Sequence, residues 1–363
     1  MTHARRLTCL GVLVFATACA RPVRVAPFPS SMDCRVAAPA SVRVDWMGPD
    51  DGRQRRRLDR WCAGVGPPDV RMAAASDLSA AGRIAVVSWN VHVGQGDVLQ
   101  LVADLRGGRL GPAPDAVVLL LQEAWRRGYP VPPVAPRDTN AAARIAPPPR
   151  APPAMDIRDI ATRLDLSLVY VPSMRNGRAA LDGRGEDRGS AVLSSLPIDA
   201  IQVVELPVER QRRVAVGSRV AGVAPGGRPW ALRVVSVHLE NRPGPGRGWI
   251  RAAAARTRQV QALLLALSST DAATREGDDN RPLLLGGDLN TWRGGGENAL
   301  RLLRRALPAD GPDDERPTFG RWRLDYLFGR LPGGITISRR RLDDAYGSDH
   351  HPVVAEIDFR GMR

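Results

Sequence analysis

The stretch that decides the fold is DAVVLLLQEAW, residues 115–125. The apolar run at residues 117–121 has no polar interruption, which is typical of a strand buried on both faces of a sheet. The run ends in Gln122 and Glu123, and an acid at the end of a buried strand needs a hydrogen-bonding partner or a cation. We therefore expect a layered α/β domain whose strands carry polar groups at their ends.

Other segments from residue 83 onward repeat this alternation of buried runs and helical patterns. The expected strands lie at residues 84–89, 168–173, 190–198, 228–240, 281–291, 321–329 and 351–359. The expected helices lie at residues 99–108, 156–166 and 250–267, where apolar residues recur at helical spacing. We predict an α/β domain in which two sheets pack face to face with helices outside them.

Length and composition exclude several classes of protein. The 363 residues suffice for one large domain or two ordinary ones, and a hydrophobic content of 44% excludes global disorder. A formal charge of +14 is compatible with nucleic acid or an anionic lipid surface as a partner. Because all 52 basic residues are arginine, we attribute this charge first to a composition bias.

The N-terminus has the pattern of a secretory signal. Residues 1–19 combine an arginine pair with an apolar run that is too short for a permanent membrane span. The sequence ATAC, which ends at Cys19, resembles a bacterial lipobox with alanine in place of the usual leucine. We expect an exported protein, anchored in the cell envelope through lipidated Cys19 or otherwise secreted.

One further segment precedes the expected α/β domain at residues 83–360, and another interrupts it. Residues 20–82 are predicted to form an N-terminal extension, partly a tether and partly a cap closed by a disulfide between Cys34 and Cys62, because cysteine pairs oxidise outside the cytosol. Residues 128–154 are dense in proline and are expected to form a long surface loop or insertion.

Polar residues that can carry chemistry lie at the ends of the buried runs. They are Asn90, His92, Gln122, Glu123, His238, Asp288, Asn290, Asp325, Asp349 and His350. Each alone is most simply a strand cap or a turn former, but their number favours a catalytic site, because loops at strand ends present functional groups on a rigid scaffold. In GGDLNT, residues 286–291, the glycines permit close backbone approach and the two polar residues project to one side of an extended chain.

The order of these segments resembles the endonuclease/exonuclease/phosphatase superfamily over about residues 83–359. The segments that carry the resemblance are WNVH (89–92), LLLQEAW (119–125), RGSAVLSSLPI (188–198), SVHLE (236–240), GGDLNT (286–291), LDYLF (324–328) and SDHHPV (348–353). The resemblance implies a four-layer α/β/β/α sandwich of two packed mixed sheets flanked by helices. It also implies a metal-dependent phosphoester hydrolase that uses Mg²⁺, with Mn²⁺ or Ca²⁺ as alternatives.

The same resemblance implies roles for individual residues. Glu123 would bind the metal with Asn90 beside it, and Asp349 would either bind the metal or brace the neighbouring histidine. His350, with its ring oriented by Asp325, would act either as a general base or as a group that polarises the phosphate.

Other roles are left with alternatives. Asp288 and Asn290 would either position the attacking water or protonate the leaving group, and His238 would contact the phosphate or act as an acid. Arg188 would clamp the phosphate through two hydrogen bonds. The acid that would support His238 has no clear counterpart, and residues 186–187 offer only weak candidates.

The paired histidines at residues 350 and 351 are not expected to act together. Neighbouring side chains of an extended chain point to opposite faces, so only one of the two can enter the site. The resemblance selects His350 and leaves His351 to pack against or cap the strand. His92 either shares the face of Asn90 or has a structural role.

Three functions fit these observations. A secreted or surface-bound nuclease would use arginines to neutralise phosphates. A phosphatase or a phospholipase C-like or sphingomyelinase-like enzyme would act on inositol phosphates or lipid headgroups, and aromatic hairpins on the cleft rim would be its sign. An inactive binding domain is disfavoured, because the set of candidate residues is complete. With 5% aromatic residues and no recognisable exposed aromatic cluster, the sequence favours the nuclease.

Overall fold

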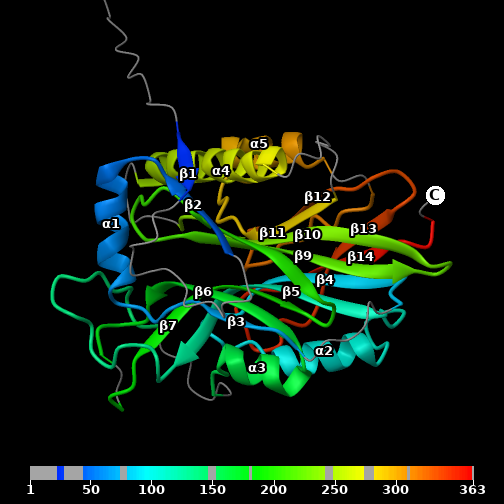
Figure 1. Cartoon of the computed structure of the whole chain (residues 1–363), viewed down its shortest axis with the longest axis horizontal. Helices are drawn as coiled ribbons and strands as arrows, with labels where there is room; N and C mark the ends of the chain where they lie inside the picture. Colours follow the sequence, from blue (N-terminus) through cyan, green and yellow to red (C-terminus); the bar gives the residue numbers. More distant parts are fainter. Residues whose placement is uncertain are drawn as a thin grey trace, which may run out of the picture.

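The computed structural model describes residues 23–27, 44–73, 80–145, 153–179, 182–241, 248–273, 282–308 and 311–361. The predicted signal segment, Cys19 and Cys34 lie outside these ranges. Within them, two seven-stranded mixed sheets pack against each other, with helices on both outer faces (Figure 1). The predicted α/β/β/α sandwich is therefore confirmed.

The first sheet has the strand order β1-β2-β8-β9-β10-β11-β12. Its strands are β1 (Val25–Pro27), β2 (Val44–Pro49), β8 (Ile198–Glu205), β9 (Val214–Ala224), β10 (Arg228–His238), β11 (Leu283–Asp288) and β12 (Asp325–Arg330). The pairs β2–β8 and β10–β11 are parallel and the other neighbours are antiparallel.

The second sheet has the order β13-β14-β4-β5-β7-β6-β3. Its strands are β3 (Asp69–Arg71), β4 (Arg83–Asn90), β5 (Ala116–Arg127), β6 (Ser167–Arg175), β7 (Glu186–Ser194), β13 (Thr336–Arg341) and β14 (Val353–Asp358). Strands β4 and β5 are its parallel pair. The run at residues 117–121 is fully buried in the middle of this sheet, as its sequence predicts.

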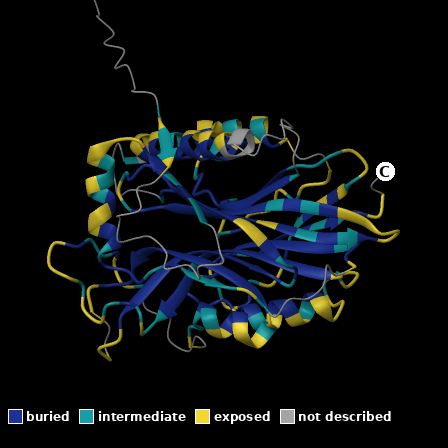
Figure 2. Ribbon diagram, viewed as in Figure 1, coloured by how far each residue is buried: buried dark blue, intermediate teal, exposed yellow. Residues whose placement is uncertain are grey.

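Three hydrophobic clusters separate the four layers. The largest lies between the sheets and contains Val118, Val216 and Leu284. A second lies between the second sheet and the helices α2 (Val98–Arg106) and α3 (Ile157–Leu164), and a third lies between the first sheet and the helices α4 (Gly248–Ala273) and α5 (Asn298–Ala306). The sheets are buried and the outer faces of the helices are exposed (Figure 2). No helix among the described residues is long and apolar enough to cross a membrane.

The sequence did not predict that the N-terminal extension contributes to both sheets. Strand β2 pairs with β8 and strand β3 pairs with β6, so this segment adds edge strands to the sandwich. Between them, α1 (Gly52–Cys62) begins at Asp51, whose side chain accepts a hydrogen bond from the backbone of Gln54. Cys62 is buried and disulfide-bonded, while the predicted partner Cys34 is not among the described residues.

The described part of the proline-rich insertion, residues 128–145, is attached to the sandwich by a buried arginine. The guanidinium of Arg175 donates hydrogen bonds to the carbonyls of Pro132 and Pro133, and also to the carbonyls of Gly64 and Gly177. One cation thus connects the insertion, the end of β6 and the turn after α1. The insertion is held against the domain by hydrogen bonds that its composition does not reveal.

Candidate active site

Strand register brings three of the predicted residues side by side. His238 ends β10 opposite Asp288 of the parallel strand β11, and Asp288 lies opposite Asp325 of the antiparallel strand β12. Gly286 and Gly287 permit this arrangement. A Cβ on Gly286 would lie 2.7 Å from Ser88 in the other sheet, and one on Gly287 would lie 1.9 Å from the carbonyl oxygen of Val237. The close backbone approach expected for this motif is confirmed.

The second sheet meets this row at the ends of β4 and β5. The amide of Asn90 donates a 3.1 Å hydrogen bond to Asp288, so the site spans both sheets. Nearby, Gln122 donates to the Ser236 hydroxyl at 3.0 Å, and that hydroxyl donates to the carbonyl of Leu121 at 3.0 Å. These bonds fix the relative position of the sheets beneath the site.

Glu123 reaches the site through an irregularity of its strand. The pairing of β5 with β7 shifts register between Leu121 and Ala124, and Glu123 has a left-handed backbone with φ of 53°. Left-handed backbone is unfavourable for a residue with a Cβ and collects at functional sites. His92 and Asn290, with φ of 45° and 51°, share this feature.

The loop between β13 and β14 supplies His350. His350 Nδ1 lies 2.7 Å from Asp325 Oδ2, and both side chains are buried. The Ser348 hydroxyl anchors the loop by donating to the carbonyl of Asn90 at 2.7 Å. His351 turns away, with its Nδ1 3.1 Å from the carbonyl oxygen of Leu342, as the alternation of an extended chain predicts.

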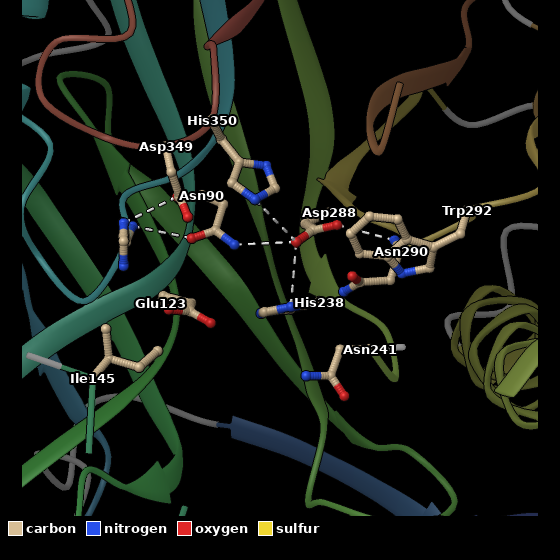
Figure 3. A pocket seen from close by; sticks show the side chains of 11 residues that line it. Asn90, Glu123, Ile145, His238, Asn241, Asp288, Asn290, Trp292, Asp349 and His350 are labelled. Atoms are coloured by element: carbon tan, nitrogen blue, oxygen red, sulfur yellow. Dashed lines mark hydrogen bonds and ion pairs between the residues drawn. The ribbon is translucent and has the colours of Figure 1, made fainter. Parts of the chain in front are cut away.

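These elements surround a cavity of about 160 Å³. Its lining contains seven of the predicted residues, namely Asn90, Glu123, His238, Asp288, Asn290, Asp349 and His350, together with His92. Figure 3 shows Asp288 at the centre, connected to Asn90, His238, His350 and Asn290. Asp325 lies behind His350 and does not line the cavity, which suits a residue that orients the histidine.

Charge distribution separates the roles of His350 and Asp288. Burial disfavours an imidazolium, but the carboxylates of Asp325, Asp288 and Asp349 raise the pKa of His350 to about 10. Burial, followed by the charge of Asp325, raises the pKa of Asp288 to about 7. His350 is therefore a cation at neutral pH, and Asp288 is the group that exchanges a proton there. Of the two roles expected for His350, this favours polarisation of the phosphate.

The other two histidines of the cavity differ in charge. Burial, with the nearby cations Arg213 and His350, lowers the pKa of His238 well below its ordinary value, so this ring is neutral. The hydrogen bond to Asp349, only 3.1 Å from His92 Nδ1, raises the pKa of His92. His92 thus faces the site and contacts Asp349, which its sequence position left undecided.

Two groups of residues offer ligand atoms for a divalent cation. Ligand atoms of Asp288, Asp325 and His350 lie within 4.8 Å of one another. The Nδ1 atom of His350 is bonded to Asp325, so a cation in this group would bind the Nε2 atom in place of its proton. Glu123 and Asp349 contribute carboxylates to the same cavity, and such oxygen donors suit Mg²⁺, Mn²⁺ or Ca²⁺.

Besides Asp325, three residues with predicted or suggested roles lie outside the cavity lining. Arg188 is buried in β7, with its Nη1 3.9 Å from Glu123 Oε2, so it lies behind the expected metal ligand. Glu186 accepts hydrogen bonds from Trp125 and Asn176, and Asp187 pairs with a buried arginine. Neither acid contacts His238. The carboxylate closest to this histidine is Asp288, with 3.4 Å between His238 Nε2 and Asp288 Oδ2.

Sequence reasoning missed Ile145, Asn241 and Trp292, which also line the cavity. Trp292 follows Asn290 by two positions, a spacing that would have indicated it. Ile145 comes from the proline-rich insertion, and its backbone N–H donates to the side chain of Asn176. Nothing in the sequence indicates that the insertion reaches the site.

The chain matches one family model and resembles several solved structures. The family model described as Endonuclease/Exonuclease/phosphatase family matches residues 87–350. No protein with a curated description matches the chain. Solved structures with a similar fold include an endonuclease/exonuclease/phosphatase from Beutenbergia cavernae, with 21% identity, coverage of 76% of this chain and 71% of the other, and a TM-score of 0.46.

Two further solved structures have lower identity. The human Nocturnin catalytic domain is 16% identical, with coverage of 80% of this chain and 97% of the other and a TM-score of 0.47. Sphingomyelinase C from Streptomyces griseocarneus is 17% identical, with coverage of 77% and 99% and a TM-score of 0.40. These similarities concern the fold.

Proposed function

We propose that this protein, which belongs to the endonuclease/exonuclease/phosphatase family and is a phosphoester hydrolase, is an exported nuclease. The observation that carries the catalytic proposal is the row His238, Asp288 and Asp325 on adjacent strands, with His350 held against Asp325. The row and His350 together place three different groups around a single cavity. His350 is cationic, His238 is neutral and Asp288 exchanges a proton near neutral pH.

Each group then has a distinct task in hydrolysis. The imidazolium of His350 donates to a non-bridging phosphate oxygen and stabilises the negative charge that develops there. Asp288, with its pKa near 7, accepts the proton of the attacking water as the water oxygen bonds to phosphorus. The ester bond to the leaving oxygen then breaks, and that oxygen takes a proton from solvent water. Neutral His238 donates one N–H to the phosphate, and Asn290 helps to orient Asp288 through its backbone N–H.

The metal site is assigned to Glu123, with Asn90 and Asp349 beside it, and Mg²⁺ is the ion we propose. A divalent ion there supplies charge neutralisation on the phosphate. Because His350 is bonded to Asp325, we assign the group of Asp288, Asp325 and His350 to proton transfer and charge stabilisation, and not to metal binding. Arg188, behind Glu123, adds positive charge on that side of the site.

A nucleic acid substrate is supported by the polar lining of the cavity. The lining is polar apart from Ile145 and Trp292, so it offers no continuous apolar groove for an acyl chain. The formal charge of +14 is compatible with a polyanionic substrate, and binding through phosphates would weaken as salt increases. Export and lipidation at Cys19 rest on the N-terminal sequence alone and belong to the same proposal.

The deciding experiment offers four substrates to the purified mature protein with Mg²⁺. Plasmid DNA, RNA, sphingomyelin vesicles and inositol phosphates are assayed in parallel. We expect hydrolysis of nucleic acid, and loss of that activity in His350→Ala and Glu123→Ala. Hydrolysis of only sphingomyelin or inositol phosphates would replace the nuclease proposal with the alternative, and full activity in both variants would refute the assigned site.

A further inference from the structure

Three aromatic rings form a cluster beside the catalytic histidine, and the catalytic proposal does not use them. Trp292 packs edge-to-face on Phe319, with ring centroids 5.8 Å apart, and on Trp322, at 5.1 Å. Phe319 in turn lies 4.7 Å from the ring of His350. All three aromatic residues are half-buried. The cluster therefore extends from His350 to the wall of the cavity.

A tight hairpin holds this cluster in place. The backbones of Phe319 and Trp322 exchange hydrogen bonds at 3.0 and 2.8 Å, with Gly320 in a left-handed conformation at the turn. The interplanar angles of 85° and 74° show that two nearly perpendicular rings support Trp292. Its ring orientation is thus fixed by packing before any substrate arrives, which reduces the entropy cost of binding.

Of these rings, Trp292 is the one that lines the cavity. It lies beside Asn290, across the cavity from Glu123 and Ile145 (Figure 3). A planar group attached to a phosphate between His350 and Glu123 would meet this ring. We propose that Trp292 is a stacking platform for the nucleobase next to the scissile phosphate, an inference that rests on the proposed nuclease function.

Charge around the cluster favours a nucleobase over a choline headgroup. Arg293 is exposed next to Trp292, and the guanidinium of Arg321 lies 4.7 Å from the ring centroid of Trp322. A quaternary ammonium would be repelled by these cations, whereas bases stack on aromatic rings while arginines neutralise the flanking phosphates. The exposed residues at the tip of the hairpin are Gly320 and Arg321, so the hairpin does not present an aromatic tip to a bilayer.

Stacking on a protein ring requires a base that is not stacked in a duplex. The platform therefore predicts a preference for single-stranded over double-stranded substrate. It also predicts little dependence on base identity, because every base has a π face. The preference for single strands and the tolerance of any base define the substrate class, which the hydrolytic chemistry alone does not specify.

The test compares two single-stranded oligomers with the same sugar-phosphate backbone. One is oligothymidylate, and the other carries tetrahydrofuran units in place of every base. We expect the wild-type protein with Mg²⁺ to prefer the base-containing oligomer by about 5- to 150-fold in kcat/KM, mostly through KM. Trp292→Ala should abolish this preference, and Trp292→Phe should retain part of it.

Control substitutions and substrates separate stacking from a structural role. Tyr129→Ala removes a side chain that is 91% exposed and outside the cavity lining, and it should keep the wild-type preference. Equal loss on both oligomers in Trp292→Ala would assign Trp292 to the support of His350 and would overturn the platform. Unchanged kinetics on both would also overturn it.

Failure of the nuclease proposal has a different signature. If the wild-type protein cleaves neither oligomer, fluorescence anisotropy with the same labelled oligomers decides the question. Binding that depends on the bases and is lost in Trp292→Ala would support the platform without nuclease activity, and absence of such binding would overturn it. Binding to phosphatidylcholine–sphingomyelin vesicles that is lost in Trp292→Ala, with no effect on oligomers, would assign the ring to choline instead.

Discussion

The Nδ1 atom of His350 lies 2.7 Å from Oδ2 of Asp325, and this pair is buried at the edge of the cavity. The carboxylate fixes which nitrogen of the ring faces inward, so Nε2 points toward Asp288 at 3.9 Å. Because Asp325 also raises the pKa of His350, the ring keeps its proton at neutral pH. The ring of His350 therefore presents its positive charge to the cavity.

Substitution of Asp325 should move the alkaline limb of the pH profile. The proposed mechanism requires cationic His350, so we expect the rate of the wild-type protein to fall as pH rises through about 10. Asp325→Asn removes the charge that holds this pKa up, so the limb should shift to lower pH and kcat should fall by about 10²- to 10⁴-fold. Asp343→Asn, at an exposed carboxylate, is the control. An alkaline limb that stays in place would contradict the assigned role of His350.

The acid limb should report Asp288. Burial and Asp325 raise the pKa of Asp288 to about 7, and the base must be deprotonated, so the rate should rise as pH increases through about 7. Asp288→Asn should lower kcat by about 10²- to 10⁴-fold and remove this limb from the residual rate. The measurement is kcat from pH 5 to 9 at saturating metal, with about one decade per pH unit below the limb. A retained acid limb in the variant would assign the base to another group.

The sequence predicted those parts of the fold and site that depend on local pattern. Apolar runs predicted the strands β4, β5, β6, β7, β10, β11, β12 and β14, but they did not predict β8 and β9 in the first sheet. The polar residue after each predicted run indicated most of the cavity. The predicted helices correspond to α2, α3 and α4, while α5 escaped because its nine residues give only a short amphipathic pattern. Strand β3 was not predicted for a similar reason, since its three half-buried residues are too few to show an alternation of apolar and polar side chains.

Features that depend on distant contacts could not be predicted. The left-handed backbone of Glu123 follows from a register shift between two strands, and neither residue type nor spacing indicates it. The contact of Trp292 with Phe319 and Trp322 joins segments that are far apart in the chain. The sequence analysis found no aromatic cluster because these rings are separated along the chain, but the fold brings them together beside the cavity.

Loss of the Glu123 carboxylate should weaken metal binding without unfolding the protein. Glu123→Gln should raise the apparent Kd for Mg²⁺ or Mn²⁺ by at least about tenfold, because loss of even an outer hydrogen-bond partner of a metal ligand costs about 10- to 100-fold in affinity. Calorimetric titration of the chelator-treated protein measures this directly. Glu209→Gln is the matched control, since Glu209 pairs with Arg258 outside the cavity. Equal affinities in the two variants would exclude Glu123 as a ligand.

Export predicts the mass of the mature protein. A lipoprotein would begin at Cys19 and carry diacylglycerol, whereas a secreted form would lack it. We expect intact-mass spectrometry of the protein from membrane extracts to show the lipidated form, and Cys19→Ala should release the protein from the membrane fraction. A mature mass without diacylglycerol would rule out the anchor, and retention of residues 1–19 would rule out export.

The buried pair Arg126 and Asp187 should dominate local stability beside the site. Asp187 accepts two hydrogen bonds from Arg126, at 2.6 and 3.1 Å, and further bonds from the Tyr170 hydroxyl at 2.8 Å and the Gly66 backbone at 2.9 Å. Asp187→Asn leaves the guanidinium buried without a counter-charge, so the free energy of unfolding should fall by about 3–5 kcal/mol. Denaturant titration of the oxidised mature protein measures the change.

The matched control for this change is an aspartate–arginine ion pair at the protein surface. Asp199 and Arg219 have side chains that are 55% and 53% exposed, and solvent screens their interaction. Asp199→Asn should therefore cost less than about 1 kcal/mol. The difference between the two variants arises from desolvation, because each removes one carboxylate charge facing one guanidinium. Equal destabilisation would mean that water reaches Arg126 in the folded protein.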